Sequence, residues 1–388
     1  MNFELPQEYR LLNESIERFA REELMPLEPA VLQREAQGQG SELTHAEQAR
    51  IDAKAKELGF WGLDCPEELG GSDLPFLAMV GVHERLAYSA VHYEFSPDSA
   101  NARMLLLNGN EMQKAQYLAP YVRGEIRGAI VISEPGAGAD PSGMATRAVR
   151  DGDHYVINGR KIWISFLGNA DFGLVMARTG DQRGARDGIS AFIVDTKTPG
   201  FKIERRIPML GGRFTYEVVF EDCHVPAGNL LGVEGKGFDP MKDRLGSRRI
   251  QMASWCIGRA QRALDMMCDY APQRKTFGQP LADRQAIQWW IADAATRIHA
   301  CRLMVQDAAW RLDNGVDAKS QLSMVKTFAT EMSWEVIDHA MQLFGGMGMT
   351  KEMPLHLMAT EARLMRVYEG PNEVHRMVVA RNALAGAR

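Results

Sequence analysis

Apolar residues recur with a helical period at both ends of the chain and with a strand period between them. The first stripe predicts a helix that ends at two prolines: Leu12, Ile16, Phe19 and Leu24, then Pro26 and Pro29. A second helix is expected to start near Thr44, with further helices to about Val122. After Gly237 the helical period returns, and Asn314-Gly315 separates two later helices.

Between about residues 127 and 221, short runs are bounded by Gly, Asp, Asn and Pro, which is typical of strands. The predicted strands are 129–133, 154–157, 161–166, 173–177, 189–195, 201–205 and 217–221. This order predicts an α+β fold with an N-terminal α-helical domain (1–125), a central antiparallel β-barrel or sandwich domain (126–236) and a C-terminal helical domain (237–388).

Two local features stand out in the stretch from residue 130 to 166. Asn158-Gly159 lies between two apolar alternating runs, and because both residues tolerate positive φ, the pair predicts a hairpin turn. Trp163 and Ser165 should share one face of the following strand. An aromatic beside a hydroxyl suits a planar ligand ring, although core packing explains Trp163 equally well at this stage. A further exposed hairpin end is expected over residues 179–188.

Composition narrows the class of protein. The net charge is −5, and no basic run exceeds two residues, which disfavours a nucleic-acid surface while leaving a local patch open. The five cysteines are scattered and none forms C-x-x-C, which argues against a disulfide framework and fits a reducing compartment. The histidines lack H-E-x-x-H spacing, so no metal site is predicted.

Targeting and membrane signals are also lacking in the pattern. The N-terminus has no apolar signal core and no Arg-rich transit pattern, which favours a cytoplasmic location. No apolar run approaches the roughly 18 residues of a membrane helix. No G-x-G-x-x-G follows a predicted strand, so a Rossmann nicotinamide site is disfavoured.

Seven segments together carry a resemblance to the acyl-CoA dehydrogenase family, in the family's order and spacing. They are 66–71 (PEELGG), 133–140 (SEPGAGAD), 158–165 (NGRKIWIS), 220–232 (FEDCHVPAGNLLG), 274–278 (RKTFG), 342–348 (QLFGGMG) and 368–370 (YEG). The resemblance covers nearly the whole chain. It implies that the C-terminal domain is a four-helix bundle and that FAD lies between the β-domain and the C-terminal helices.

The resemblance assigns one wall of the flavin site to the middle segment. By motif position, Ile132 and Ser133 would meet the pyrimidine side of the flavin. Trp163 would flank the ring, and Ser165 would approach its N5 edge. These assignments favour a ligand-binding role for the face that carries Trp163.

The resemblance assigns the adenosine-diphosphate end of FAD to the C-terminal segment. Arg274 and Phe277 would serve an FAD bound by a neighbouring subunit, which implies a homodimer or homotetramer. Gln342 is assigned to cofactor binding, and Gly345 and Gly346 would let backbone N–H groups approach the pyrophosphate. Without the family context, the two glycines read as an ordinary helix C-cap.

Glu369 is the predicted catalytic base. It precedes Gly370-Pro371, where a helix must stop, so its carboxylate can lie at a cavity wall. Taken alone, a Glu before Gly is more often structural or solvated, but Tyr-Glu-Gly is the family's usual base motif. Some members carry the base just before an Arg equivalent to Arg249; that position is Arg248 here, which cannot accept a proton.

The implied reaction converts an acyl-CoA to the trans-2-enoyl-CoA. Glu369 would remove the α-proton while the β-hydrogen leaves as hydride to flavin N5, and the electrons pass to an electron-transferring flavoprotein. Desolvation by the acyl chain and flavin is expected to raise the Glu369 pKa toward neutrality. Tyr368, Gly370 and Arg249 are assigned to the substrate.

The chain departs from the family pattern near the predicted ligands. Ala139 replaces a serine near the CoA arm, where it is still assigned to substrate binding. The ending Glu369-Gly-Pro-Asn-Glu373 replaces Glu-Gly-Thr-x-Gln, and residues 210–217 replace the usual Arg-x-Ser-Asp-Thr loop. CoA and FAD contacts at these places are therefore not carried over.

Three other functions use the same fold. An acyl-CoA oxidase differs mainly in how reduced flavin meets oxygen, which the pattern does not settle. Flavin-dependent monooxygenases generally lack the Tyr-Glu-Gly base, so Glu369 counts against them. A non-catalytic DNA-binding relative would need a basic surface, which a net charge of −5 disfavours. Acyl-chain length is not readable, because it depends on packing between residues 80–107 and 236–255.

Overall fold

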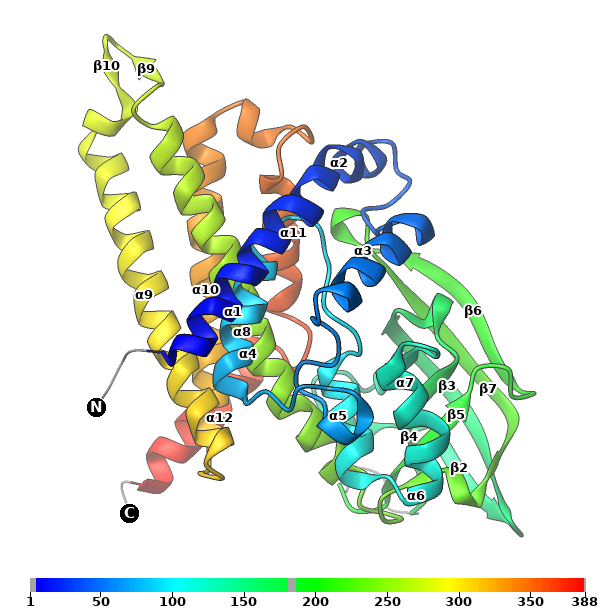
Figure 1. Cartoon of the computed structure of the whole chain (residues 1–388). Coiled ribbons are helices and arrows are strands. Elements are labelled where there is room, and N and C mark those ends of the chain that lie inside the picture. Colours follow the sequence, from blue (N-terminus) through cyan, green and yellow to red (C-terminus); the bar gives the residue numbers. More distant parts are fainter. Residues whose placement is uncertain (1–4, 181–185, 387–388) are drawn as a thin grey trace.

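The computed structural model describes residues 5–180 and 186–386. Figure 1 shows the sheet of the middle segment on one side of the molecule and the long C-terminal helices on the other, with N-terminal helices packed across and between them. The predicted order of helices, a mostly antiparallel sheet and helices is confirmed. The exact domain boundaries remain predictions, since hydrophobic clusters cross them: Val80 and Ala87 pack with the C-terminal helices.

The N-terminal segment is helical, as predicted. Its helices are α1 (Gln7–Phe19), α2 (Glu28–Ala36), α3 (His45–Glu57), α4 (Phe76–Leu86), α5 (Ser99–Asn108), α6 (Glu111–Gln113) and α7 (Ala119–Arg123). The start near Thr44 is confirmed by a capping box in which the Thr44 hydroxyl accepts from the Glu47 N–H. The prolines do not end the first helix. Pro26 and Pro29 occupy first-turn positions, where no N–H is needed, and the chain stays helical to Ala36.

The middle segment forms one sheet in the order β6-β7-β3-β2-β4-β5-β8, with β1 paired to β4. The strands are β1 (Gly128–Val131), β2 (Arg147–Asp151), β3 (His154–Ser165), β4 (Phe172–Arg178), β5 (Ile189–Asp195), β6 (Phe201–Pro208), β7 (Phe214–Pro226) and β8 (Leu230–Leu231). Most pairs are antiparallel, whereas β4 pairs in parallel with β1 and β2. The predicted loop 179–188 joins two antiparallel strands, β4 and β5, and its residues 181–185 lie outside the described part of the chain.

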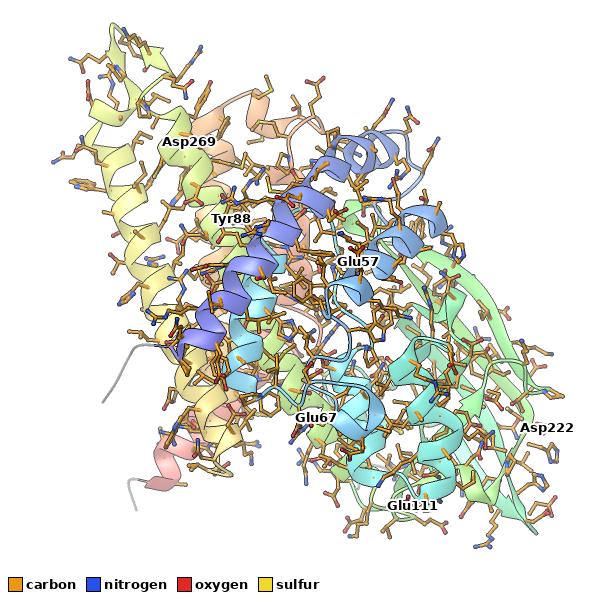
Figure 2. The ribbon with its side chains drawn as sticks, in the orientation of Figure 1. Glu57, Glu67, Tyr88, Glu111, Asp222 and Asp269 are labelled. Carbon is orange, nitrogen blue, oxygen red and sulfur yellow. The ribbon has the colours of Figure 1, made fainter. Side chains whose placement is uncertain are left out.

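The predicted hairpin turn at Asn158-Gly159 is wrong, because both residues lie inside the continuous strand β3. Asn158 hydrogen-bonds the Asp222 N–H and carboxylate on β7, and Figure 2 shows Asp222 at the outer side of the sheet. Gly159 is needed for close packing, since a Cβ there would lie 2.5 Å from Thr146 Oγ1. The actual turn, Gly152-Asp153, joins β3 to β2, a strand that the pattern missed.

The C-terminal segment contains α8 (Phe238–Tyr270), α9 (Gln285–Asp313), α10 (Lys319–Phe344), α11 (Leu355–Met365) and α12 (Asn372–Gly386). The predicted break at Asn314-Gly315 is confirmed, with Gly315 at a φ of 65° between α9 and α10. The predicted apolar face of α8 is buried: Ile250, Ala253, Ile257, Leu264 and Met267. A short hairpin, β9 (Lys275–Thr276) and β10 (Gln279–Pro280), joins α8 to α9.

Some features bear on function by what the described residues lack. None of the described helices is long and apolar enough to cross a membrane. Within residues 5–180 and 186–386, no cluster of three or more His, Cys, Asp or Glu side chains could hold a metal. All five cysteines are free thiols.

Candidate active site

Glu369 lies in a tight turn between α11 and α12. Its φ of 55° and the φ of 92° at Gly370 are both left-handed, a conformation that is strained for a non-glycine residue. Two buried side chains hold the turn: Lys326 donates to the Gly370 carbonyl at 2.7 Å, and His375 Nε2 lies 3.2 Å from the Glu369 carbonyl. The turn thereby fixes the direction of the Glu369 side chain.

The Glu369 carboxylate is ion-paired. Its side chain is 14% exposed, and Arg244 Nη1 lies 3.1 Å from both of its oxygens. Arg248 Nε lies 4.0 Å from Oε1. Burial raises the pKa of Glu369, but Arg244 and Arg248 outweigh it, so the pKa is lowered from its ordinary value. With protein groups alone, the predicted rise toward neutrality is therefore not found.

A charged layer continues from Glu369 toward the segment before α5. Arg248 Nη1 donates to Glu94 at 3.0 Å and lies 3.6 Å from Asp98 Oδ2. Gln251 donates to the same Glu94 oxygen at 2.9 Å. The surface where α8 meets residues 92–101 is thus polar next to Glu369, although an apolar acyl chain would favour an apolar one.

The strand β3 supplies a second wall. Trp163 is 51% exposed and Ser165 is exposed, whereas Ile162 and Ile164 are buried, so the predicted two faces are confirmed. Ser133 lies beside this strand, because its carbonyl accepts from the Ile162 N–H at 2.9 Å. Trp163 has a φ of 63°, which turns the backbone locally away from the regular strand.

Ile132 is brought to the same wall by a buried lysine. Lys161 Nζ donates to the Ile132 carbonyl at 2.9 Å and to Glu134 at 2.8 Å. Lys161 is wholly buried, and burial lowers its pKa to about 8. The predicted residues of the β-domain, Ile132, Ser133, Trp163 and Ser165, therefore come together.

The two walls are connected through side chains that sequence reasoning missed. At the end of β3, Phe166 stacks on His92 with ring centroids 6.1 Å apart, and the Arg213 guanidinium lies 5.8 Å from the Phe166 ring. Arg213 in turn lies 3.4 Å from Glu361, which accepts from the Tyr368 hydroxyl at 3.2 Å. In the sequence, these side chains are signalled by the unusual loop 210–217, which contains Arg213.

The remaining predicted cofactor residues lie elsewhere in the chain. Phe277 is 98% exposed in the β9–β10 hairpin, and Figure 1 shows this hairpin projecting at the end of the bundle away from the sheet. The rings of Tyr270 and Phe344 stack 4.3 Å apart, so the ends of α8 and α10 lie together. The residues concerned, Arg274, Phe277, Gln342, Gly345 and Gly346, thus gather at one end of the bundle, and their role stays a prediction.

The predicted substrate residues lie in two places, around Glu369 and in a loop of the β-domain. Arg249, Tyr368 and Gly370 lie around Glu369, and Arg249 is half-buried. Ala139 is exposed in the loop that follows the Glu134–Ala137 bridge.

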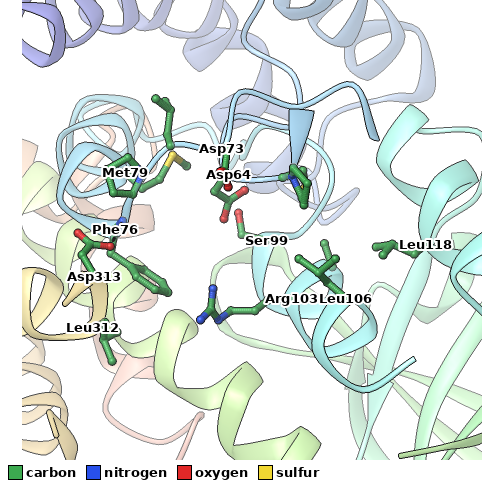
Figure 3. Close-up of a pocket in the computed structure, with 15 residues that line it drawn as sticks. Asp64, Asp73, Phe76, Met79, Ser99, Arg103, Leu106, Leu118, Leu312 and Asp313 are labelled. Atoms are coloured by element: carbon green, nitrogen blue, oxygen red, sulfur yellow. Dashed lines mark hydrogen bonds between the residues drawn. The ribbon is translucent and has the colours of Figure 1, made fainter. Parts of the chain in front are cut away.

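The described residues line two cavities, and neither cavity includes Glu369. One of about 260 Å³ adjoins Glu134 and Thr146 and is lined partly by Gly136, Gly143 and Gly159. The other, of about 300 Å³, lies beside α5, where Asp64, Ser99 and Arg103 face it (Figure 3). Burial raises the pKa of Asp64 to about 6.

The chemistry of the β3 wall fits a planar cofactor. An exposed indole and an exposed hydroxyl stand on one face of a strand whose opposite face is buried. At the bundle end, a Cβ added to Gly345 or Gly346 would meet nothing within 4 Å, which leaves their backbone open to a ligand. These observations agree with a ring at Trp163 and a phosphate group near the glycines.

The family comparisons cover nearly the whole chain. The acyl-CoA dehydrogenase N-terminal, middle and C-terminal domain families match residues 6–125, 129–223 and 235–384. The chain is 39% identical to (R)-benzylsuccinyl-CoA dehydrogenase of Thauera aromatica, over 100% of this chain and 98% of that protein.

Solved structures support the same family assignment. Butyryl-CoA dehydrogenase of Megasphaera elsdenii superposes with a TM-score of 0.89 at 33% identity, covering 99% of this chain and 100% of that one. An FAD complex of PigA superposes with a TM-score of 0.88 at 27% identity, covering 99% of each chain. FAD is the cofactor of this fold. The chain is an enzyme of the acyl-CoA dehydrogenase family.

Proposed function

We propose that this enzyme oxidises an acyl-CoA thioester to the trans-2-enoyl-CoA with Glu369 as the base. One observation carries the proposal. A buried carboxylate is held in a strained turn, and a chain of contacts through Tyr368, Glu361 and Arg213 joins it to the strand that exposes Trp163 and Ser165. A base and a ring-binding face are thereby held in a fixed relation.

The protein groups would act in the following way. Bound FAD would supply the two-electron oxidant needed to take up the β-hydrogen as hydride. Glu369 removes the α-proton, and the turn fixed by Lys326 and His375 aims its carboxylate. The Glu369 N–H has no backbone acceptor among the described residues, so it is free to donate to the thioester carbonyl and stabilise developing enolate charge.

We further propose an electron-transferring flavoprotein as the electron acceptor. Support comes from a relative, the caffeyl-CoA reductase-Etf complex subunit CarC of Acetobacterium woodii, which is 40% identical over 85% of this chain and 88% of that protein.

Assembly as a homodimer or homotetramer is proposed because the exposed β9–β10 hairpin carries Arg274 and Phe277 away from its own β3 wall. A cytoplasmic location stays a proposal.

The test is an anaerobic titration of the flavin-containing protein with a panel of acyl-CoAs, followed by flavin absorbance. Loss of the absorbance with a member of the panel supports the reaction. Reoxidation by an added electron-transferring flavoprotein should be much faster than by air. Fast reoxidation by air alone would instead favour an oxidase, and a protein that neither copurifies with nor rebinds flavin contradicts the whole proposal.

A further inference from the structure

Three arginines of α8 surround the catalytic carboxylate. Arg244 and Arg248 are one helical turn apart and are only 3% and 6% exposed, and Arg249 follows directly. Buried guanidinium groups are costly unless acceptors satisfy them. An aliphatic acyl chain offers none, so acceptors for these donors must come from the protein or from a polar group of the ligand.

The donors of this cluster are incompletely used. Arg244 Nε donates to Asn101 at 2.8 Å and Nη1 to Glu369, but Nη2 has no partner in the described part of the chain. Arg248 Nε is buried without an acceptor. Arg249 Nε is also buried and unpaired, and no hydrogen bond or ion pair of Arg249 occurs among residues 5–180 and 186–386. The site therefore has donors to spare next to Glu369.

The ion pairs around Glu369 also leave donors for a further anion. The three guanidinium groups face the carboxylates of Glu369, Glu94 and Asp98. Burial raises the pKa of Glu94, which favours its neutral form, whereas Arg248 and Arg244 lower the pKa of Asp98. The three carboxylates do not use all the donors, because Arg248 Nε and Arg249 Nε stay without a hydrogen-bond acceptor, so a further anion would find donors at this place.

Resting on the proposed function, we propose that the acyl group carries a second carboxylate, as in the CoA thioester of a dicarboxylic acid, and that Arg244 binds it. A guanidinium fork matches a carboxylate with two parallel hydrogen bonds. Arg244 would then break its ion pair with Glu369 and bind the substrate carboxylate instead. Substrate binding would thereby free Glu369 to act as the base. A substrate without the carboxylate leaves Glu369 held in its ion pair.

The dimensions suit a short chain. A base that reaches the α-carbon lies beside Arg244 Nη1, 3.1 Å away. In a five-carbon dicarboxylic thioester, three C–C bonds of about 1.5 Å place the free carboxylate roughly 4 Å from the α-carbon. Arg244 can therefore bind the acyl carboxylate while Glu369 reaches the α-proton.

The experiment compares glutaryl-CoA with pentanoyl-CoA, which has a methyl group in place of the free carboxylate. In anaerobic reduction of the holoenzyme flavin, kcat/KM should favour glutaryl-CoA by roughly 10²-fold or more, because pentanoyl-CoA leaves Glu369 in its ion pair with Arg244 and offers the spare donors no acceptor. Arg244→Gln should remove this preference: KM for glutaryl-CoA rises by roughly 10²-fold, and the ratio of kcat/KM between the two thioesters falls to about one.

Two further variants separate recognition from folding. Arg244→Lys keeps the charge without the fork and should give an intermediate preference. Arg262→Gln, on the same helix but paired with Glu28, should leave the preference unchanged. Equal reduction by both thioesters in the wild-type enzyme overturns the inference and leaves the proposed function intact. If no thioester of either series reduces the flavin, the proposed function fails, and the inference with it.

Discussion

Two buried ion pairs of this enzyme differ in how completely their atoms are bonded. We call Lys161–Glu134 the closed pair and Arg244–Glu369 the open pair. In the closed pair, Lys161 donates to Ile132 and Glu134, and Glu134 also accepts from two backbone N–H groups, at 2.5 and 3.0 Å. In the open pair, Arg244 Nη2 lacks a partner among the described residues, and a second guanidinium lies 4.0 Å from Glu369.

The difference separates a pair that can only be structural from one that can exchange a partner, as the proposed function requires of Glu369. A buried charge pair whose remaining donors and acceptors are satisfied has nothing to exchange, so it fixes geometry, here the approach of Ile132 to β3. A pair with spare donors can accept another anion without losing all its hydrogen bonds. The open pair is also the one held by a strained turn, which is typical of functional sites.

The largest effect is expected from breaking the open pair at its carboxylate. Glu369→Gln keeps the shape but cannot accept the α-proton, so the rate of flavin reduction by substrate should fall by about 10²–10⁴-fold. Stopped-flow absorbance measures this rate. Glu373→Gln, an exposed neighbour, is the matched control and should reduce at the wild-type rate. A Glu369→Gln enzyme that reduces normally would rule out this base.

Breaking the closed pair should cost stability. Lys161→Met leaves the Glu134 carboxylate buried without its cation, which typically costs about 3–5 kcal/mol in free energy of unfolding. The expected result is a marked fall in the denaturant midpoint. Lys202→Met removes the exposed Lys202–Glu221 pair of the same sheet and should leave the denaturant midpoint nearly unchanged, because solvent screens an exposed pair. Equal effects of the two variants would contradict the contrast between buried and exposed pairs.

A pH series tests the carboxylate that joins the two walls. Burial raises the pKa of Glu361, but Arg213 and Arg259 outweigh it and lower the pKa to about 2. Because the folded pKa is depressed, the stabilisation is present above the ordinary value of about 4.5 and is lost as pH falls from there toward 2. Between pH 5 and pH 3, the Tm of the wild type should fall further than that of Glu361→Gln. Parallel pH profiles would mean that the pKa of Glu361 is the same in the folded and unfolded protein, which contradicts the depressed pKa.

The smallest effect is expected on the affinity for FAD, from a change at Trp163, the exposed residue two positions after Lys161. Trp163→Ala should weaken FAD binding by about 0.5–1.5 kcal/mol beyond lost contact area, or up to roughly tenfold in Kd. Fluorescence titration of the flavin-depleted protein measures this. Trp289→Ala on α9 removes a similarly exposed indole, at 60% against 51%, and should leave Kd unchanged. Equal FAD affinities of the wild type, Trp163→Ala and Trp289→Ala would mean that Trp163 does not contact the cofactor.

Local chemistry made much of this fold predictable. The capping box at Thr44, the break at Gly315 and the two faces around Trp163 depend on residues a few positions apart, so a single pattern carries them. The same reasoning failed at Asn158-Gly159. There, contacts with Asp222 and Thr146 override the turn propensity and keep β3 continuous.

The order of helices and strands, the family motifs and the choice of Glu369 as candidate base follow from the amino-acid sequence alone. The electrostatics around that base depend on the folded arrangement. Arg244 is 125 residues from Glu369 in the chain, and Arg213 is 148 residues from Glu361. The pKa of a carboxylate depends on charges within a few ångströms, and only folding determines which charges those are.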